Sequence, residues 1–195
     1  MIIVLMGKTA SGKDSVCREL AKRGVTRIIT YTTRPIRPGE TNGISYHFIS
    51  KDDFIKKINE GFFAEYKEYH VADGSIWYYG SAAQDYDTDE LRTIILTPAG
   101  YRDMKDVLSG KSYTIYLYAN RATIRKRLAK RGDDKTEADR RLEQDRIDFR
   151  GLECEVDRIV YNSGGKTISE IADEILKYVK SKEGMPRNEN VIHGF

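Results

Sequence analysis

A glycine-rich heptapeptide near the start of the chain places the strongest limit on its fold. Residues 7–13 read GKTASGK, satisfy the pattern GxxxxGK and follow an apolar run at 2–6. A buried strand, this loop and a helix beginning near Lys13 form the context in which such a loop binds phosphate. Its backbone N–H groups, the helix N-terminus and the lysine all present positive charge to one point. The sequence therefore predicts a nucleotide site here, the alternative being a glycine-rich turn without a ligand, and the expected contacts are Gly7, Lys8, Thr9, Ala10, Ser11, Gly12, Lys13, Asp14 and Ser15.

The residue after Lys13 departs from the usual motif. Ser or Thr normally follows the lysine and binds Mg²⁺ through its hydroxyl, whereas this chain has Asp14 and then Ser15. A carboxylate is a good hard ligand for Mg²⁺, although it adds negative charge beside the phosphates. We expect ATP and Mg²⁺ as cofactors, with Asp14 as the candidate metal ligand.

Strand and helix patterns alternate along most of the remaining chain. Apolar, β-prone runs recur at 27–31, 93–96, 112–118 and 158–161. Helical patterns lie at 13–23, 51–60, 100–108, 121–130, 136–149 and 167–180. This alternation predicts an α/β fold with a parallel, doubly wound sheet. Residues 34–81 break the rhythm with turn signals and many tyrosines, so we expect a small insertion that stands off the main sheet.

Composition limits the class of protein. The 195 residues are 39% apolar and 32% charged, as in soluble globular domains. No apolar run approaches the roughly 20 residues of a membrane span, and the first run lacks the flanks of a signal peptide. Cys17 and Cys154 form no metal-binding pattern and are expected to be buried apolar side chains in a reducing cytoplasm. We therefore expect a cytoplasmic monomer or weak homo-oligomer that binds small-molecule nucleotides, and no nucleic acid or membrane.

Positive charge is concentrated in one window of the chain. Residues 121–150 hold eleven Lys/Arg and seven Asp/Glu, a local excess of +4 against +3 for the whole chain. An anionic, compact ligand should be attracted to this segment.

Three groups of motifs resemble those of one family. The segment 30–40 reads TYTTRPIRPGE and precedes NG at 42–43 and YHF at 46–48. FFAEY at 62–66 precedes WYYGS at 77–81, and RKRL at 125–128, RG at 131–132 and RRL at 140–142 come later. In order and spacing they resemble the monophosphate-binding segment, the glutamate and YYGS elements, and the lid of guanylate kinases. The resemblance runs from residue 2 to about 180.

This resemblance implies a P-loop NTPase fold and phosphorylation of GMP or dGMP by ATP. It implies a core at 1–33 and 82–181 with a lid at about 125–145, a monophosphate-binding subdomain at 34–81 and a loosely ordered tail at 182–195. Forked arginine donors suit a phosphate dianion, phenol hydroxyls can donate to it, and an ionised glutamate suits the N–H donors of guanine. The residues expected at the monophosphate are Thr30, Arg34, Arg37, Tyr46, Glu65, Tyr79, Gly80, Ser81 and Thr97.

The lid resemblance implies arginines that close over the triphosphate. Phosphoryl transfer needs in-line positioning and cations around the moving group, which arginines on a mobile segment supply. The expected catalytic residues are Lys13, Arg127, Arg131 and Arg141, and Asn162 resembles a position near the adenine ring. Simpler alternatives are an exposed basic helix face, a solvated arginine pair at 34 and 37, and tyrosines that only pack.

One element of the family pattern is missing. In guanylate kinases the strand matching 93–96 ends in an Asp-x-Asp element, in which one acid supports the metal and the other helps to read guanine. This chain has Ile95-Leu96-Thr97 instead. We hypothesise that Asp14 replaces the lost metal-site acid. Thr97 retains only a neutral acceptor, which leaves open a same-fold kinase for another nucleotide or phosphorylated small molecule, and also an inactive guanylate-kinase-like binding module.

Overall fold

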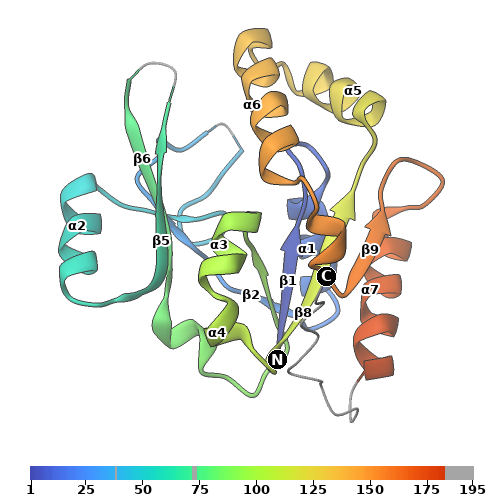
Figure 1. Ribbon diagram of the computed structural model, residues 1–195, viewed down its shortest axis with the longest axis horizontal. Helices are drawn as coiled ribbons and strands as arrows, with labels where there is room; N and C mark the ends of the chain where they lie inside the picture. The colour runs from blue at the N-terminus through green and yellow to red at the C-terminus, as the bar shows by residue number, and fades with distance from the viewer. Residues whose placement is uncertain (38, 72–73, 183–195) are drawn as a thin grey trace, which may run out of the picture.

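The computed structural model describes residues 1–37, 39–71 and 74–182. Two sheets organise them (Figure 1). The larger has the order β2-β7-β1-β8-β9, and all its pairs are parallel. Its strands are β1 (Ile2–Met6), β2 (Thr26–Arg27), β7 (Arg92–Ile95), β8 (Ser112–Tyr118) and β9 (Arg158–Tyr161).

Alternate residues of β1 face two different cores. Ile3 and Leu5 pack with α1 (Lys13–Ala21) and α7 (Ile168–Lys182) on one face of the sheet. Ile2 and Val4 pack on the other face, against α3 (Pro98–Asp103), α4 (Lys105–Leu108) and the segment after α6 (Lys135–Asp148). Because both faces are covered, the strands read as continuous apolar runs. The predicted doubly wound α/β fold is confirmed.

The smaller sheet stands beside the larger one, on the left of Figure 1. Its order is β4-β3-β6-β5, with β3 (Tyr31–Thr32), β4 (His47–Phe48), β5 (Phe63–His70) and β6 (Ile76–Ala82). Helix α2 (Lys51–Asn59) covers it through Phe54, which is stacked on Phe63 at 4.4 Å between ring centroids. The sheet begins at Tyr31 and ends at Ala82, while the division of the chain at 34 and 81 stays a prediction.

Helices α5 (Arg121–Arg131) and α6 form an arm above the carboxyl ends of the large sheet (Figure 1). Asn120 caps α5, Gly132 ends it at φ 75°, and Asp134 caps α6 by accepting a bond from Glu137 N. A small apolar cluster joins the two helices through Ile124, Leu128 and Ala138. The rest of the two helices is rich in charged residues.

Two sequence expectations were wrong in detail. The run 27–31 is not one strand, because the chain leaves the large sheet after Arg27 and enters the small sheet at Tyr31. The helix expected at 100–108 begins at Pro98, since Thr97 caps it by accepting from Gly100 N at 3.1 Å, and it is interrupted at Met104. The tail expected at 182–195 falls outside the described residues after Lys182.

Buried Cys17 agrees with its expected place, whereas Cys154 is exposed at the end of a 3-10 turn, contrary to expectation. None of the helices within the described ranges has both the length and the apolar character of a membrane span.

Candidate active site

The P-loop, residues 7–13, connects β1 to α1 and closes around Lys13. The Lys13 ammonium donates to the carbonyls of Gly7 at 2.6 Å and Lys8 at 3.1 Å. Glycine is required at two positions: a Cβ on Gly7 would lie 2.7 Å from the Leu117 carbonyl, and Gly12 has φ 102°. Burial lowers the pKa of Lys13, against the opposing charges of Asp14 and Asp145. The loop therefore holds a partly desolvated cation at the start of a helix, as a phosphate site requires.

The side chains of Arg127 and Asn162 hydrogen-bond to the backbone of this loop. The Arg127 guanidinium donates to the carbonyls of Ala10 at 3.1 Å and Ser11 at 2.9 Å, and to Asn162 Oδ1 at 3.0 Å. The buried Asn162 amide in turn donates to Ser11 O at 2.7 Å. Both side chains thus hold the shape of the loop by bonding its backbone.

Arg34 and Arg37, together with Glu40, form a second cationic cradle. Buried Arg34 donates to Glu40 Oε1 at 2.7 Å and lies over the Tyr46 ring at 5.4 Å. Glu40 Oε2 accepts from Arg37 N at 2.8 Å. Burial and the charges of Arg34 and Arg141 lower the pKa of Arg37. Of these arginines, Arg37 and Arg141 line the cavity, and the like charges of Arg34 and Arg141 both act on Arg37.

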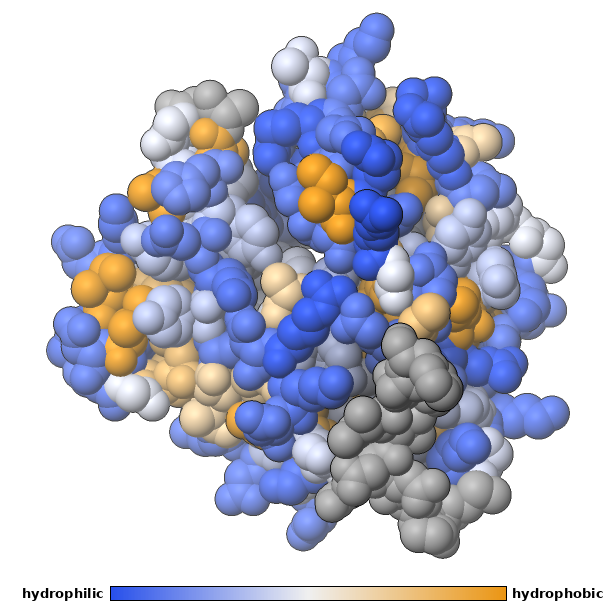
Figure 2. Space-filling model, in the orientation of Figure 1, coloured by the Kyte–Doolittle hydropathy of each residue, from blue (hydrophilic) through white to orange (hydrophobic). Residues whose placement is uncertain are grey.

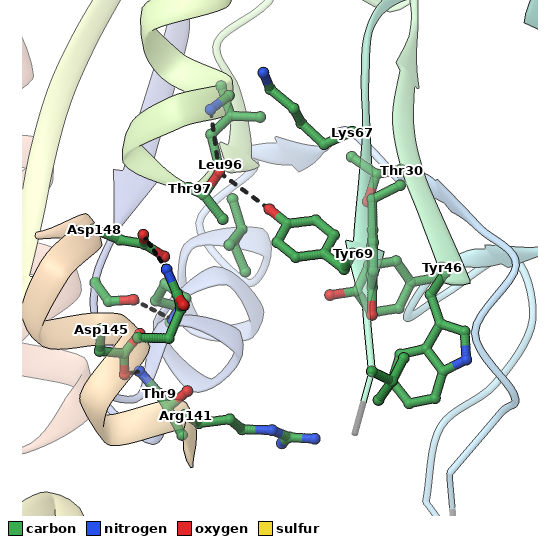
Figure 3. Close-up of a pocket in the computed structure, with 18 of the residues that line it drawn as sticks. Thr9, Thr30, Tyr46, Lys67, Tyr69, Leu96, Thr97, Arg141, Asp145 and Asp148 are labelled. Carbon is green, nitrogen blue, oxygen red and sulfur yellow. Dashed lines mark hydrogen bonds between the residues drawn. The ribbon is translucent and has the colours of Figure 1, made fainter. Parts of the chain in front are cut away.

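The side of the small sheet that lines the cavity carries a half-buried carboxylate, that of Glu65. Glu65 on β5 lies opposite Ser81 on β6, and the Ser81 hydroxyl donates to Glu65 Oε1 at 2.8 Å. Burial raises the pKa of Glu65, while the bond from Ser81 lowers it. Across the site, Thr97 Oγ1 faces the Tyr69 hydroxyl at 3.4 Å (Figure 3). Thr97 is therefore committed partly to its helix cap and partly to Tyr69.

Two predicted arginines of the α5–α6 arm, Arg131 and Arg141, are paired with acids. Arg131 is bonded to Asp133 through two hydrogen bonds, and Arg141 donates to Glu137 at 2.7 Å. Arg140 and Arg141 together lower the pKa of Glu137 to about 2. In Figure 3 the Arg141 side chain extends from α6 toward the side of the cavity that carries Tyr46.

One cavity of about 340 Å³ joins these parts. Figure 2 shows the surface hollowed between the β5–β6 hairpin and α6. The cavity is lined by predicted residues from the P-loop, both sheets and the arm: Gly7, Thr9, Lys13, Thr30, Arg37, Tyr46, Glu65, Tyr79, Gly80, Thr97 and Arg141. The two anion cradles thus open into the same space.

A family model described as "Guanylate kinase" matches residues 1–181. The chain belongs to the guanylate kinase family. The guanylate kinase of Syntrophus aciditrophicus is 31% identical over 189 residues, which cover 92% of this chain and 87% of the relative. That of Thermotoga maritima is 30% identical and covers 100% of this chain and 93% of the relative. The crystal structure of guanylate kinase from Anaplasma phagocytophilum has a TM-score of 0.71 at 19% identity, covering 94% of this chain and 87% of that one, and it supports the fold.

Several of the residues that the sequence predicted for the site do not line the cavity. Arg34, Ser81, Arg127 and Asn162 act behind the surface through the bonds given above, and Arg131 is half exposed on the arm. The other predicted residues outside the lining belong to the P-loop and the start of α1: Lys8, Ala10, Ser11, Gly12, Asp14 and Ser15.

Asp14 is not among the residues that line the cavity. Its carboxylate, with the side chain 63% exposed, accepts from Arg27 at 3.1 Å. Within the described ranges no group of three or more His, Cys, Asp or Glu side chains is arranged to hold a metal ion.

Two parts of the lining were missed from sequence. Asp145 and Asp148 on α6 line the cavity, and Asp145 Oδ2 accepts from the P-loop amide Thr9 N at 2.7 Å (Figure 3). Lys67 and Tyr69 line it from β5. The three-residue spacing of the two acids was a usable signal, because it places them on one helix face.

Proposed function

We propose that this chain transfers the γ-phosphoryl group of ATP to GMP or dGMP, giving ADP and the nucleoside diphosphate. One observation carries the proposal: the P-loop cradle and the arginine-tyrosine cradle open into a single cavity that Glu65 also lines. A phosphate donor and a nucleoside monophosphate can therefore lie with their phosphates adjacent. The membership of the family supports the same activity.

On the acceptor side, Arg37 and the phenols of Tyr46 and Tyr79 bind the monophosphate. Burial raises the pKa of Tyr46 to about 12, so its hydroxyl stays protonated and donates a hydrogen bond at any physiological pH. Arg34, held by Glu40, shapes the loop that presents Arg37.

On the donor side, the P-loop amides and Lys13 bind the β- and γ-phosphates of ATP. Arg131 and Arg141 exchange their present acid partners for phosphate oxygens when the arm closes, and the closed arm excludes water that would hydrolyse ATP. Arg127 and Asn162 contribute by holding the loop rigid. The reaction is then in-line transfer between positioned phosphates.

Mg²⁺ forms part of this proposal. Bound with ATP, it neutralises phosphate charge and orients the γ-phosphoryl group. The donor set fits, because Asp14 follows Lys13 in the first turn of α1 and is exposed enough to leave Arg27. Asp145, beside Thr9 and Lys13, is a second carboxylate within the site.

Glu65 supports guanine as the base. An ionised carboxylate accepts the N1–H and N2–H groups of guanine, whereas adenine presents an acceptor at N1. Thr97 is neutral and cannot replace a charged hydrogen-bond acceptor. Monophosphates of hypoxanthine and of other bases should therefore be tested as phosphoryl acceptors as well. The intact P-loop disfavours an inactive binding module. We further propose that residues 34–81 form the monophosphate-binding subdomain and about 125–145 the lid, and that the protein acts in the cytoplasm as a monomer or weak homo-oligomer.

A coupled assay of ADP formation tests the proposal. The purified chain is given MgATP with GMP, dGMP, IMP, AMP, CMP or UMP in turn. We expect the highest kcat/KM with GMP and dGMP. Turnover with another monophosphate above that with GMP would overturn the assigned base, and ADP formation independent of any acceptor would overturn the transferase itself.

A further inference from the structure

Tyr86 is a buried tyrosine that connects the core to the acceptor site. It lies in the 3-10 turn η1 (Ala83–Tyr86) that follows β6, and only 6% of its surface is exposed. Its ring packs in the core cluster that contains Ile2, Val4 and Ile94. Its hydroxyl leaves this core and donates to Ser81 Oγ at 2.7 Å.

The bond from Tyr86 starts a directional chain. Ser81 is fully buried and bonds Glu65 Oε1 at 2.8 Å. A serine hydroxyl has a single proton. Because Tyr86 donates to Ser81, that proton is directed at Glu65 Oε1.

We propose that Tyr86 is a positioning residue for recognition of the acceptor base. Acting through Ser81, it fixes the Glu65 carboxylate as an ionised acceptor for a purine that carries N1–H, such as guanine or hypoxanthine. Tyr86 itself does not line the cavity, so it touches no substrate. This inference rests on the proposed function, because it concerns the same acceptor site.

The ionisation state of Glu65 determines how these hydrogen bonds affect specificity for the acceptor base. Burial raises the pKa of Glu65, and the bond from Ser81 opposes that rise. A protonated Glu65 offers one donor and one acceptor, which match N1 and N6 of adenine. Loss of the Tyr86 hydroxyl frees the Ser81 proton to rotate, weakens its bond to Glu65 and reduces the discrimination against adenine.

Tyr86→Phe removes the hydroxyl and keeps the packed ring. We expect KM and Kd for GMP and IMP to rise about three- to tenfold, the range of one lost hydrogen bond. The KM for ATP and the kcat at saturating GMP should stay near wild type. The acid limb of GMP affinity should move to higher pH, a change that a loss of packing alone would not produce.

Tyr116→Phe is the matched control. Tyr116 is fully buried in the same core cluster, and its hydroxyl has no hydrogen-bond partner among the described residues. Its substitution should leave GMP affinity and its pH profile unchanged. Thermal denaturation of both variants shows whether each keeps the fold.

A double-mutant cycle with Ser81→Ala decides whether Tyr86 acts through Ser81. If it does, Tyr86→Phe has no further effect on GMP affinity in the Ser81→Ala background, whereas full additivity overturns the relay. Calorimetric titration measures the affinities of all four proteins for GMP and IMP. Normal GMP turnover by the wild type with unchanged affinity in Tyr86→Phe overturns this inference alone. Absence of GMP binding and turnover in the wild type overturns the proposed function and the inference with it.

Discussion

Arg34 and Glu40 form an ion pair of 2.7 Å in which the arginine side chain is 3% exposed. The other Glu40 oxygen accepts from the backbone N–H of Arg37, so one carboxylate fixes both the side chain of Arg34 and the turn that carries Arg37. Although burial opposes its ionisation, the hydrogen bonds from Arg34 and Arg37 lower the pKa of Glu40. Glu40 is thus a structural counter-charge within the proposed monophosphate site.

We predict that Glu40→Gln raises the KM for GMP by about tenfold, because a charge-assisted bond contributes about 1.5–3 kcal/mol. The KM for ATP should not change, since Glu40 lies outside the P-loop. Steady-state kinetics with each substrate varied measures both. Glu60→Gln is the control, because the exposed Glu60 carboxylate pairs with Lys56 at 3.9 Å and does not line the cavity. An equal rise in both KM values would show that Glu40 supports the whole fold instead.

Local patterns predicted most of the fold because its core strands are buried on both faces. The strands 112–118 and 158–161 have the predicted bounds. The sequence of the run 27–31 did not show that its two ends belong to different sheets. That division depends on the pairing partners, because Arg27 pairs with Thr93 and Tyr31 pairs with Gly80. Pairing of distant strands is not a local property of the chain.

Residues of the P-loop could be predicted because a sequence motif specifies them. Residues that reach the cavity only because distant elements pack together were missed. The P-loop needed only glycine spacing and a preceding strand. Asp145 was counted among the charges of a basic window, and only the docking of α6 places it on Thr9 N. Tyr69 reaches Thr97 across the gap between the two sheets, an approach that no sequence spacing encodes.

Glu65→Gln should separate stability from binding. Burial raises the pKa of Glu65 above its unfolded value, so its contribution to stability is present at low pH and is lost as pH rises through the folded pKa. We expect Glu65→Gln to have a Tm equal to or above that of wild type at pH 7, and a GMP affinity at least about tenfold weaker, because an amide donor faces the N–H groups of guanine. Differential scanning fluorimetry and calorimetry measure the two effects. A lower Tm at pH 7 with unchanged GMP affinity would contradict the assignment.

Asp14→Ser restores the hydroxyl that usually follows the P-loop lysine. If Asp14 holds Mg²⁺, the variant should need about severalfold more Mg²⁺ for half-maximal turnover, in line with a weakened hard-ligand set. Its affinity for ATP in the presence of a chelator should be unchanged or tighter, because a negative charge is removed. Turnover titrated with Mg²⁺ and calorimetry with ATP measure the two quantities. The same Mg²⁺ requirement as wild type would remove Asp14 as the metal ligand.

The Asp145→Asn variant is compared with Asp14→Ser, to decide which of the two carboxylates binds the metal. Burial raises the pKa of Asp145, against the bond from Thr9 N and the charge of Lys13. If Asp145 is only a counter-charge to Lys13, its neutral isostere should bind ATP more tightly both with and without Mg²⁺, since a like charge beside the phosphates is gone. Calorimetry under the two conditions measures this. A loss of Mg²⁺-dependent binding in Asp145→Asn alone would assign the metal to α6.

Arg127→Lys tests whether Arg127 is an anchor or a mobile lid group. Its guanidinium bonds the carbonyls of Ala10 and Ser11 together with Asn162, and a lysine cannot reproduce that fork. We expect a loss of about 3 kcal/mol in unfolding free energy, from two or more bonds to a charged group, and weaker ATP binding. Arg131→Lys should leave stability near wild type, because Arg131 is half exposed, and should lower kcat. Urea denaturation and single-turnover kinetics separate the two variants. A lower kcat in Arg127→Lys with unchanged stability and ATP affinity would instead mean that Arg127 acts on the transferring phosphoryl group.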